Sequence, residues 1–323
     1  MNSTPQTNYY EDEIDLKELW QTIVSQKLFI AIFTIVVTFL AVIYALSKPN
    51  EYESKTVLVV QEVGGSGAGS AGGNLGLLAS MAGVNLSSAA EGISPAEGYT
   101  TLLNDYNFMK EFILNKGFHY RFLDPNLSDN YKFALGIDWV YRLFSYSSDD
   151  KENFDDLELA KQEAIIYGIV KNVQGILTIS GGDLKTNLLT ISAKHPDATL
   201  TKDLVEEFLK EASYYLKVND MVENDRKILY YEEALSRATD VTLRTRLAEL
   251  GSALIQKKVL ANVNDFYNVK QLTKPEVAYQ RDKAGPKRAL IVLVAMVTGV
   301  ILSIFIVFFR EFLKNQEEQL EAK

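Results

Sequence analysis

Two long runs without a charged residue constrain this chain more than any other feature. One covers residues 28–46 and is 19 residues long, and the other covers residues 289–309 and is 21 residues long. A helix of about 20 apolar residues, rising about 1.5 Å per residue, crosses a bilayer core of about 30 Å. Because the runs lie near opposite ends of the chain, two transmembrane helices are favoured over two buried core helices.

The first run differs from a cleaved signal peptide. It is too long and lies too deep in the chain, and no A-x-A-like cleavage site follows it. We therefore expect residues 28–46 to remain as one anchor and residues 289–309 to form a second. The chain is then predicted to be a two-pass membrane protein.

Lysine and arginine residues beside the spans predict their orientation, because cytoplasmic flanks carry an excess of both. Lys17 and Lys27 precede the first span, and Arg310 and Lys314 follow the second. Two spans place both tails on the same side of the membrane. We therefore expect both tails in the cytoplasm.

This orientation sets the predicted domain organisation. Cytoplasmic tails are expected at 1–27 and 310–323, and a large periplasmic domain is expected at 47–288. Lys287 and Arg288 lie on the periplasmic side, against the charge rule. Long domains cross membranes largely regardless of charge, so these two residues do not overturn the prediction.

The charge balance argues against a nucleic-acid partner. The chain has 33 Lys and Arg residues against 42 Asp and Glu, a formal net charge of −9. Most of these charges belong to the predicted outer domain, which is also net acidic and offers no basic face. The chain has no cysteine, so disulfides cannot stabilise that domain.

A short amphipathic helix is predicted just before the first span. Asp15 and Glu18 have the spacing of a capping box. Leu16, Leu19 and Trp20 share one helical face, and Trp20 would sit at the level of the lipid headgroups. We expect a helix in the membrane interface, with an ordinary helix start that does not touch the membrane as the alternative.

The outer domain is predicted to mix strands and helices. Residues 52–63 are rich in β-branched side chains and predict a strand, and the glycine-rich stretch 64–83 predicts a flexible loop with a short helix. Two further β-rich runs, 176–180 and 187–193, flank a polar loop and predict a hairpin. Helices are expected at 99–117, 131–144 and 156–173.

The largest feature outside the membrane is a predicted helix at about 197–273. No glycine or proline occurs from Asp197 to Leu250, and apolar residues recur at coiled-coil-like spacing. A continuous helix of this length would form an arm of roughly 110 Å. The alternative is two or three shorter helices with a break near 239–242, where helix propensity is weak.

No catalytic, cofactor-binding or metal-binding residue is predicted. His119 and His195 lack a partner at metal-ligand spacing, and the chain has neither a G-x-S-x-G motif nor a cysteine nucleophile. Adjacent acidic pairs would point away from each other on a helix. We therefore expect a protein that is not an enzyme and needs no cofactor.

The second span carries a ladder of small residues. Ala295, Gly299 and Ser303 recur every four residues along one helix face. Small side chains let membrane helices approach closely. We expect this face to pack against the first span or against a neighbouring subunit.

A proline-containing segment leads into the second span. Pro275 is expected to end the long helix, because proline cannot continue one. The chain up to Pro286 is then an extended connector back to the membrane. Lys287 and Arg288 are expected at the headgroups, where cations pair with anionic lipid.

These features together resemble the Wzz family of chain-length determinants, the polysaccharide co-polymerases of Gram-negative inner membranes. The matching residues are EIDLKELW before the first span, YESKTVLVV after it, and the proline-containing approach to the second span. The family shows a further proline between the positions of Pro275 and Pro286. This chain has Ala278 and Tyr279 in that region.

The resemblance implies an α+β membrane protein. Two transmembrane helices would flank a periplasmic domain with a mixed α/β base and a long extended helical arm. Subunits would assemble into a ring or bell on the membrane. The implied function is to set the modal length of O-antigen in lipopolysaccharide, with a Wzy-type polymerase and lipid-linked polysaccharide as partners.

Other functions remain open from the sequence. The chain could act as a capsule or exopolysaccharide co-polymerase, or as an export component, together with a separate kinase or transporter. A transmembrane sensor is a further alternative, but it would need a cytoplasmic output module that the 14 residues after Phe309 are too few to form.

Overall fold

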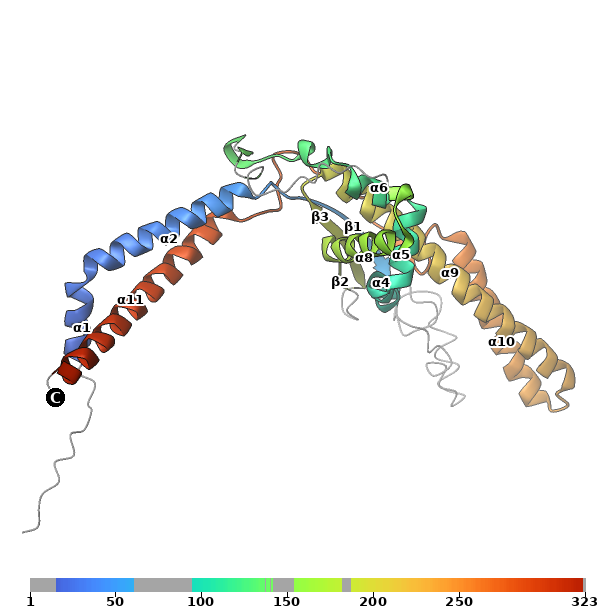
Figure 1. The fold of residues 1–323 in the computed structure, drawn as a ribbon. Helices are drawn as coiled ribbons and strands as arrows, with labels where there is room; N and C mark the ends of the chain where they lie inside the picture. Colours follow the sequence, from blue (N-terminus) through green and yellow to red (C-terminus); the bar gives the residue numbers. More distant parts are fainter. Residues whose placement is uncertain are drawn as a thin grey trace, which may run out of the picture. The chain divides into compact units, whose positions relative to one another are not determined.

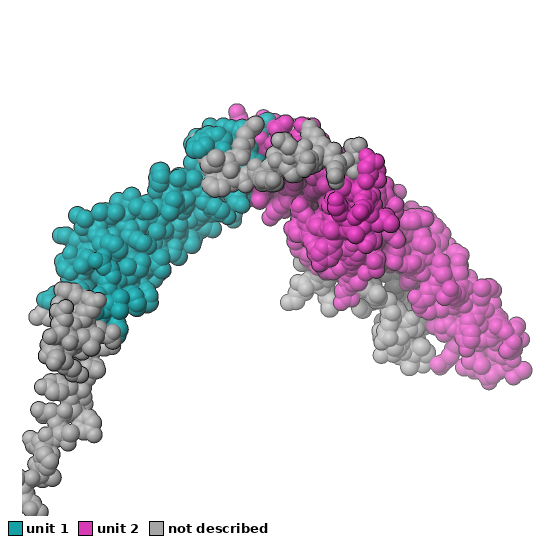
Figure 2. Space-filling model, in the orientation of Figure 1, with its two compact units in different colours: residues 1–49, 132–146, 285–323 teal, residues 50–131, 147–284 magenta. Residues whose placement is uncertain are grey.

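The computed structural model is mostly helical with one small sheet (Figure 1). It describes residues 16–60, 95–136, 138–139, 141, 154–181 and 187–321. The chain divides into two compact units (Figure 2). We call them the helix-pair unit, residues 1–49, 132–146 and 285–323, and the sheet unit, residues 50–131 and 147–284.

The helix-pair unit contains both predicted spans as helices. They are α2 (Lys27–Ser47) and α11 (Arg288–Glu321), and α1 (Leu16–Ser25) precedes α2. Both α2 and α11 are long and apolar enough to cross a membrane, and only 6% and 17% of their apolar windows are buried. Such exposed apolar helices are not core helices of the unit that contains them.

The bend between α1 and α2 lies at Gln26. This residue has φ −101° and ψ 15°. Backbone hydrogen bonds continue across it, since Gln26 N donates to Thr22 O at 3.1 Å and Ile30 N donates to Gln26 O at 3.1 Å. The two helices therefore form one bent helical run.

The sheet unit is built on a four-stranded antiparallel sheet with strand order β2-β3-β1-β4. The strands are β1 (Tyr52–Val60), β2 (Leu177–Gly181), β3 (Leu188–His195) and β4 (Val269–Gln271). The predicted hairpin is confirmed, because β2 and β3 pair directly. Strand β4 was not predicted, and residues 61–83 of the predicted strand and glycine-rich loop lie outside the described residues.

Helices cover the sheet and close the core of this unit. They are α4 (Pro95–Asn104), α5 (Tyr106–Asn115), α6 (Phe118–Leu123), α8 (Leu159–Ile176) and the first half of α9 (Ala198–Arg237). The core centres on Phe112, Phe208 and Leu58, all at most 1% exposed. Leu200, Leu204 and Phe208 recur every four residues on α9, which places one face of that helix on the sheet.

Two predicted helices differ in the structure. The predicted helix 99–117 is interrupted at Asp105, whose side chain accepts a hydrogen bond from Phe108 N at 2.7 Å and caps α5. The predicted helix 131–144 is wrong over residues 131–136. That stretch contains a 3₁₀ turn (η3, Ala134–Gly136), with Leu135 at φ 56°. The remaining 3₁₀ turns described are η2 (Leu127–Asn130) and η4 (Phe154–Asp156).

The predicted single helix over 197–273 is wrong. Two helices take its place, α9 with 40 residues and α10 (Val241–Val263) with 23 residues. Residues 238–240 separate them, beside the 239–242 stretch where the alternative prediction placed a break. Figure 1 shows α9 and α10 side by side as a helical hairpin, which we call the arm.

The break has a local cause and a long-range one. Ala238 is extended, with φ −72° and ψ 124°, and the Asp240 side chain accepts a hydrogen bond from Leu243 N at 2.8 Å to cap α10. The helices then run antiparallel, and Lys257 Nζ lies 3.0 Å from Asp220 Oδ1. A single helix would leave its apolar stripe in water, whereas the hairpin partly buries it.

Pro275 therefore does not end a helix. Helix α10 ends at Val263, and the chain returns to the sheet through a turn in which Asn268 has φ 55°. Strand β4 follows and pairs with β1 before Pro275 is reached. The pairing of β4 with β1 is a long-range contact. It is favoured over continuing the helix, although the local sequence pattern is helical.

Candidate functional site

Helix α11 approaches α2 closely at Gly299. A Cβ atom built on Gly299 would lie 3.3 Å from Val37 Cγ1 and 3.7 Å from Thr34 Cα. A Cβ at this position would thus already touch a backbone atom of α2, so the two helix backbones approach closely at Gly299. Ser303 is fully buried one turn further along α11, and Ala295 is half-buried one turn before.

The hydroxyl groups of Thr34 and Ser303 are satisfied within their own helices, whereas the buried Thr38 hydroxyl, one turn along α2 from Thr34, has no hydrogen-bond partner among the described residues. Thr34 Oγ1 donates to Ile30 O at 2.8 Å, and Ser303 Oγ donates to Val300 O at 2.7 Å. Polar groups in an apolar environment are costly unless they are hydrogen-bonded. The crossing can therefore sit in lipid without an unpaired hydroxyl at either position.

Arg288 joins the first turn of α11 to the last turn of α2. Its Nε donates to Ala45 O at 2.9 Å, and a terminal guanidinium nitrogen donates to Lys48 O at 2.7 Å. The last carbonyls of a helix have no partner within that helix. Arg288 supplies donors to them, while the neighbouring Lys287 is exposed. Sequence reasoning assigned both cations to lipid headgroups and missed this use of Arg288.

The segment that leads to α11 follows the edge of β1. Leu272 N donates to Val57 O at 2.8 Å, and Ala284 N donates to Glu51 O at 2.9 Å. Strand β4 covers only the far end of β1, so this segment covers the rest of the same edge. Pro275 is buried within the segment.

Two threonines fasten the start of this segment to β1. Thr56 Oγ1 donates to Thr273 O at 2.6 Å, and Val57 N donates to Thr273 Oγ1 at 2.9 Å. Thr56 is fully buried. The sequence pattern gave no signal for this pair, because the partners are more than 200 positions apart.

Pro286 is half-buried and follows a cis peptide bond from Gly285. The four residues predicted for the proline segment are therefore found in different surroundings. Pro275 packs in the sheet unit, whereas Pro286, Lys287 and Arg288 belong to the helix-pair unit.

The predicted interfacial helix is α1. Leu16 and Leu19 lie in it, Trp20 is 66% exposed, and Asp15 lies outside the described residues. The exposure of Trp20 leaves its ring available for contact outside the unit.

A polar cluster fixes the start of α9 on the sheet. Asp197 Oδ1 accepts hydrogen bonds from Thr199 N at 2.8 Å and Leu200 N at 3.1 Å, which caps the helix. These bonds, together with the nearby Arg121 guanidinium, outweigh burial and lower the pKa of Asp197. His195 Nδ1 accepts a hydrogen bond from Asp197 N at 3.0 Å. Burial lowers the pKa of His195 to about 4, so this imidazole is neutral at pH 7.

A second polar cluster holds the base of the arm together. Asp220 on α9 binds Lys257 of α10 at 3.0 Å, accepts a hydrogen bond from Asn224 Nδ2 at 2.7 Å, and accepts another from the Tyr267 hydroxyl. Tyr267 N donates to Ser213 Oγ at 2.6 Å. Burial and the Asp220 carboxylate raise the pKa of Tyr267. The cluster ties α9, α10 and the turn before β4 to one another.

The outer part of the arm keeps large apolar side chains in solvent. Leu229 is 65% exposed, Tyr230 is 67% exposed and Val241 is 77% exposed. Isolated exposed apolar residues are common, but several along one slender hairpin mark a contact surface. Beyond Asn224, no described side chain of α9 is buried.

A protein-family model matches about the first third of the chain. Residues 12–115 match the model of a protein family described as "Wzz: Chain length determinant protein". The matched stretch includes α1, α2, β1, α4 and α5. No curated protein matches the chain. A solved structure titled "full-length bacterial polysaccharide co-polymerase" matches over 93% of this chain and 99% of its own, with 15% identity and a TM-score of 0.35.

Proposed function

We propose, from the Wzz-family assignment that the match over residues 12–115 supports, that this chain is a membrane protein that regulates the length of a surface polysaccharide. The matched residues include α1, the first apolar helix and β1, one of the two inner strands of the sheet. This match is the observation that carries the proposal. Members of the family act as regulators and not as enzymes.

The regulated polymer is proposed to be the O-antigen of lipopolysaccharide. In this role the chain acts beside a Wzy-type polymerase, which forms the glycosidic bonds, and contacts lipid-linked polysaccharide. The exposed apolar side chains of the arm support self-association, because such a surface is stabilised when a second copy covers it. We therefore propose a homo-oligomer in which each copy contributes one arm.

The proposed placement is the bacterial inner membrane. Helices α2 and α11 would be the two spans, both tails would lie in the cytoplasm, and the sheet unit and arm would lie in the periplasm. The apolar lengths of α2 and α11 support two crossings. The lysine and arginine residues beside them support the orientation.

The test is the length distribution of the surface polymer in a strain that lacks the gene. We expect the modal band pattern of lipopolysaccharide to collapse while the total amount of polymer stays similar, because the polymerase is intact. Restoring the gene should restore the mode. Unchanged lengths of lipopolysaccharide, capsule and exopolysaccharide would overturn the proposal.

The same strain separates the alternative functions. A change confined to capsule or exopolysaccharide would assign the chain to those polymers. Finished polymer retained inside the cell, with normal length, would indicate an export component. Restoring the gene with Pro275→Ala or Pro286→Ala should shift polymer length while the protein still inserts into the membrane.

A further inference from the structure

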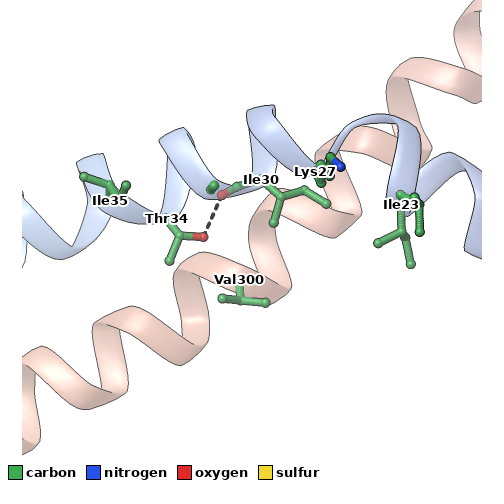
Figure 3. A pocket seen from close by; sticks show the side chains of 8 residues that line it. Ile23, Lys27, Ile30, Thr34, Ile35 and Val300 are labelled. Atoms are coloured by element: carbon green, nitrogen blue, oxygen red, sulfur yellow. Dashed lines mark hydrogen bonds between the residues drawn. The ribbon is translucent and has the colours of Figure 1, made fainter.

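Helices α1, α2 and α11 enclose a groove of about 440 Å³. Its walls include Ile23 from α1, Ile30 from α2 and Val300 from α11 (Figure 3). Pockets that hold small molecules have volumes of about 300–1,000 Å³. The groove is thus large enough for part of a lipid molecule.

The groove is apolar except at one end. Thr34 lines it, but its hydroxyl donates to Ile30 O at 2.8 Å and is already satisfied (Figure 3). Lys27 is the charged residue of the lining and lies where α1 bends into α2. The groove therefore offers an apolar channel with a cation at its mouth.

Lys27 has no partner among the described side chains. The Lys27 side chain is exposed, and no ion pair joins it to a carboxylate of the residues that the structure describes. A lysine at the end of an apolar span contributes a binding free energy of about 1 kcal/mol for anionic lipid headgroups. Its charge and the apolar walls together match a molecule with a negatively charged head and a hydrocarbon tail.

We propose that this groove binds one anionic phospholipid, with an acyl chain along Ile30 and Val300 and the phosphate at Lys27. The site depends on α2 and α11 lying in a membrane and is independent of any role in polymer length. In a bilayer, lipid is what borders exposed apolar helix faces, so an acyl chain is the natural occupant of the channel. The proposed site would stabilise the bend at Gln26 by filling the space beneath it.

A second groove at the other end of the helix pair provides a contrast. It measures about 530 Å³ and is lined by Thr38, Met296 and Arg288 among others. The Arg288 guanidinium donates to Ala45 O and Lys48 O. Its cation is thus engaged within the protein, unlike Lys27.

Native mass spectrometry of the full-length chain tests the proposal. The detergent-solubilised protein is titrated with phosphatidylglycerol or with phosphatidylcholine of the same acyl chains. We expect the first phosphatidylglycerol to bind about fivefold more tightly, the ratio that about 1 kcal/mol gives. Lys27→Gln should reduce this ratio to about one. Equal binding of the two lipids by the unaltered chain would overturn the proposal.

Arg310→Gln is the matched control for charge. Arg310 lies over the Phe29 ring, 5.5 Å from its centroid, and is not part of the groove lining. The Arg310→Gln variant should still bind phosphatidylglycerol more tightly than phosphatidylcholine. If Arg310→Gln lowers the preference as much as Lys27→Gln, the attraction is a general surface effect and the proposed site is wrong.

Ala31→Phe tests the channel itself. Ala31 lines the groove and is exposed, so a larger side chain fills the groove with little strain in the fold. We expect at least threefold weaker binding of both lipids. Val36→Phe, at an exposed position that lines neither groove, should bind as the unaltered chain does. Tighter binding of a polyprenyl phosphate than of phosphatidylglycerol would contradict the proposed occupant.

Discussion

Arg288 illustrates how one side chain can join two distant parts of the chain. Its guanidinium donates to two carbonyls at the end of α2, at 2.9 Å and 2.7 Å, although these partners lie 243 and 240 positions away in the chain. Lys287, the next residue, is exposed. Arginine suits this task because its planar group presents several donors at fixed angles.

Arg288→Met should therefore destabilise the helix-pair unit. Hydrogen bonds to charged groups contribute about 1.5–3 kcal/mol each, and partial exposure of Arg288 reduces this, so we expect a loss of about 2 kcal/mol. Thermal unfolding of the full chain in detergent, followed by circular dichroism, measures the loss. The matched control Lys287→Met should unfold at the same temperature as the unaltered chain. Equal effects of the two substitutions would mean that Arg288 acts only as a surface charge.

His195 predicts a pH dependence of stability. Its pKa is lowered from 6.5 to about 4 by burial, so the unfolded chain binds the proton more readily than the folded chain between these values. Stability therefore falls as the pH drops from about 6.5 to about 4, by roughly 3 kcal/mol at most. His195→Gln should show a shallower loss over this range when melting temperatures are compared. An unchanged slope would show that His195 does not titrate as its burial implies.

At the scale of elements, the crossing of α2 and α11 depends on the size of residue 299. Gly299→Ala should be nearly neutral, because a gain in helix propensity of about 1 kcal/mol offsets a contact of 3.3 Å with the movable Val37 side chain. Gly299→Leu should separate the helices and lower the melting temperature by several degrees. Val297→Leu, at a position 51% exposed, serves as the control. A stable Gly299→Leu variant would show that the close approach is dispensable.

The base of the arm depends on Asp220. Asp220→Ala would leave Lys257, Asn224 and the Tyr267 hydroxyl without their shared acceptor. We expect a loss of about 1–2 kcal/mol, since the group is partly exposed, and faster amide hydrogen exchange in α10. Asp225→Ala breaks only the more exposed bridge to Lys258 and should have little effect. Equal rates of amide hydrogen exchange in the Asp220→Ala and Asp225→Ala variants would show that the Asp220 cluster does not stabilise the packing of α10 against α9.

The sequence predicts those elements that local patterns determine. The two apolar runs form helices, and the β-rich runs around the polar loop form the β2–β3 hairpin. The arm was mispredicted because its helical periodicity continues past the break. The Asp240 cap provides a local signal for a new helix start, but the antiparallel packing of α10 against α9 is a tertiary contact that the local pattern does not show. Strand β4 was missed because its three residues form a strand only by pairing with β1.

The candidate site was predictable to a similar degree. The spacing of Ala295, Gly299 and Ser303 could be read from a helical period, and the structure places Gly299 against α2. The hydrogen bonds of Arg288 and of the Thr56–Thr273 pair could not be predicted from the sequence, because each joins residues more than 200 positions apart. Such contacts depend on the tertiary fold and leave no local pattern.

At the scale of the whole molecule, the proposed function separates control of length from catalysis. The most direct measurement uses vesicles that hold a Wzy-type polymerase and lipid-linked repeat units, with or without the purified full-length chain, and resolves the products by gel electrophoresis. The proposed role predicts a broad distribution from the polymerase alone, a narrow modal length when the chain is added, and no polymer from the chain alone. A product distribution that the chain leaves unchanged, or polymer formed without the polymerase, would contradict it.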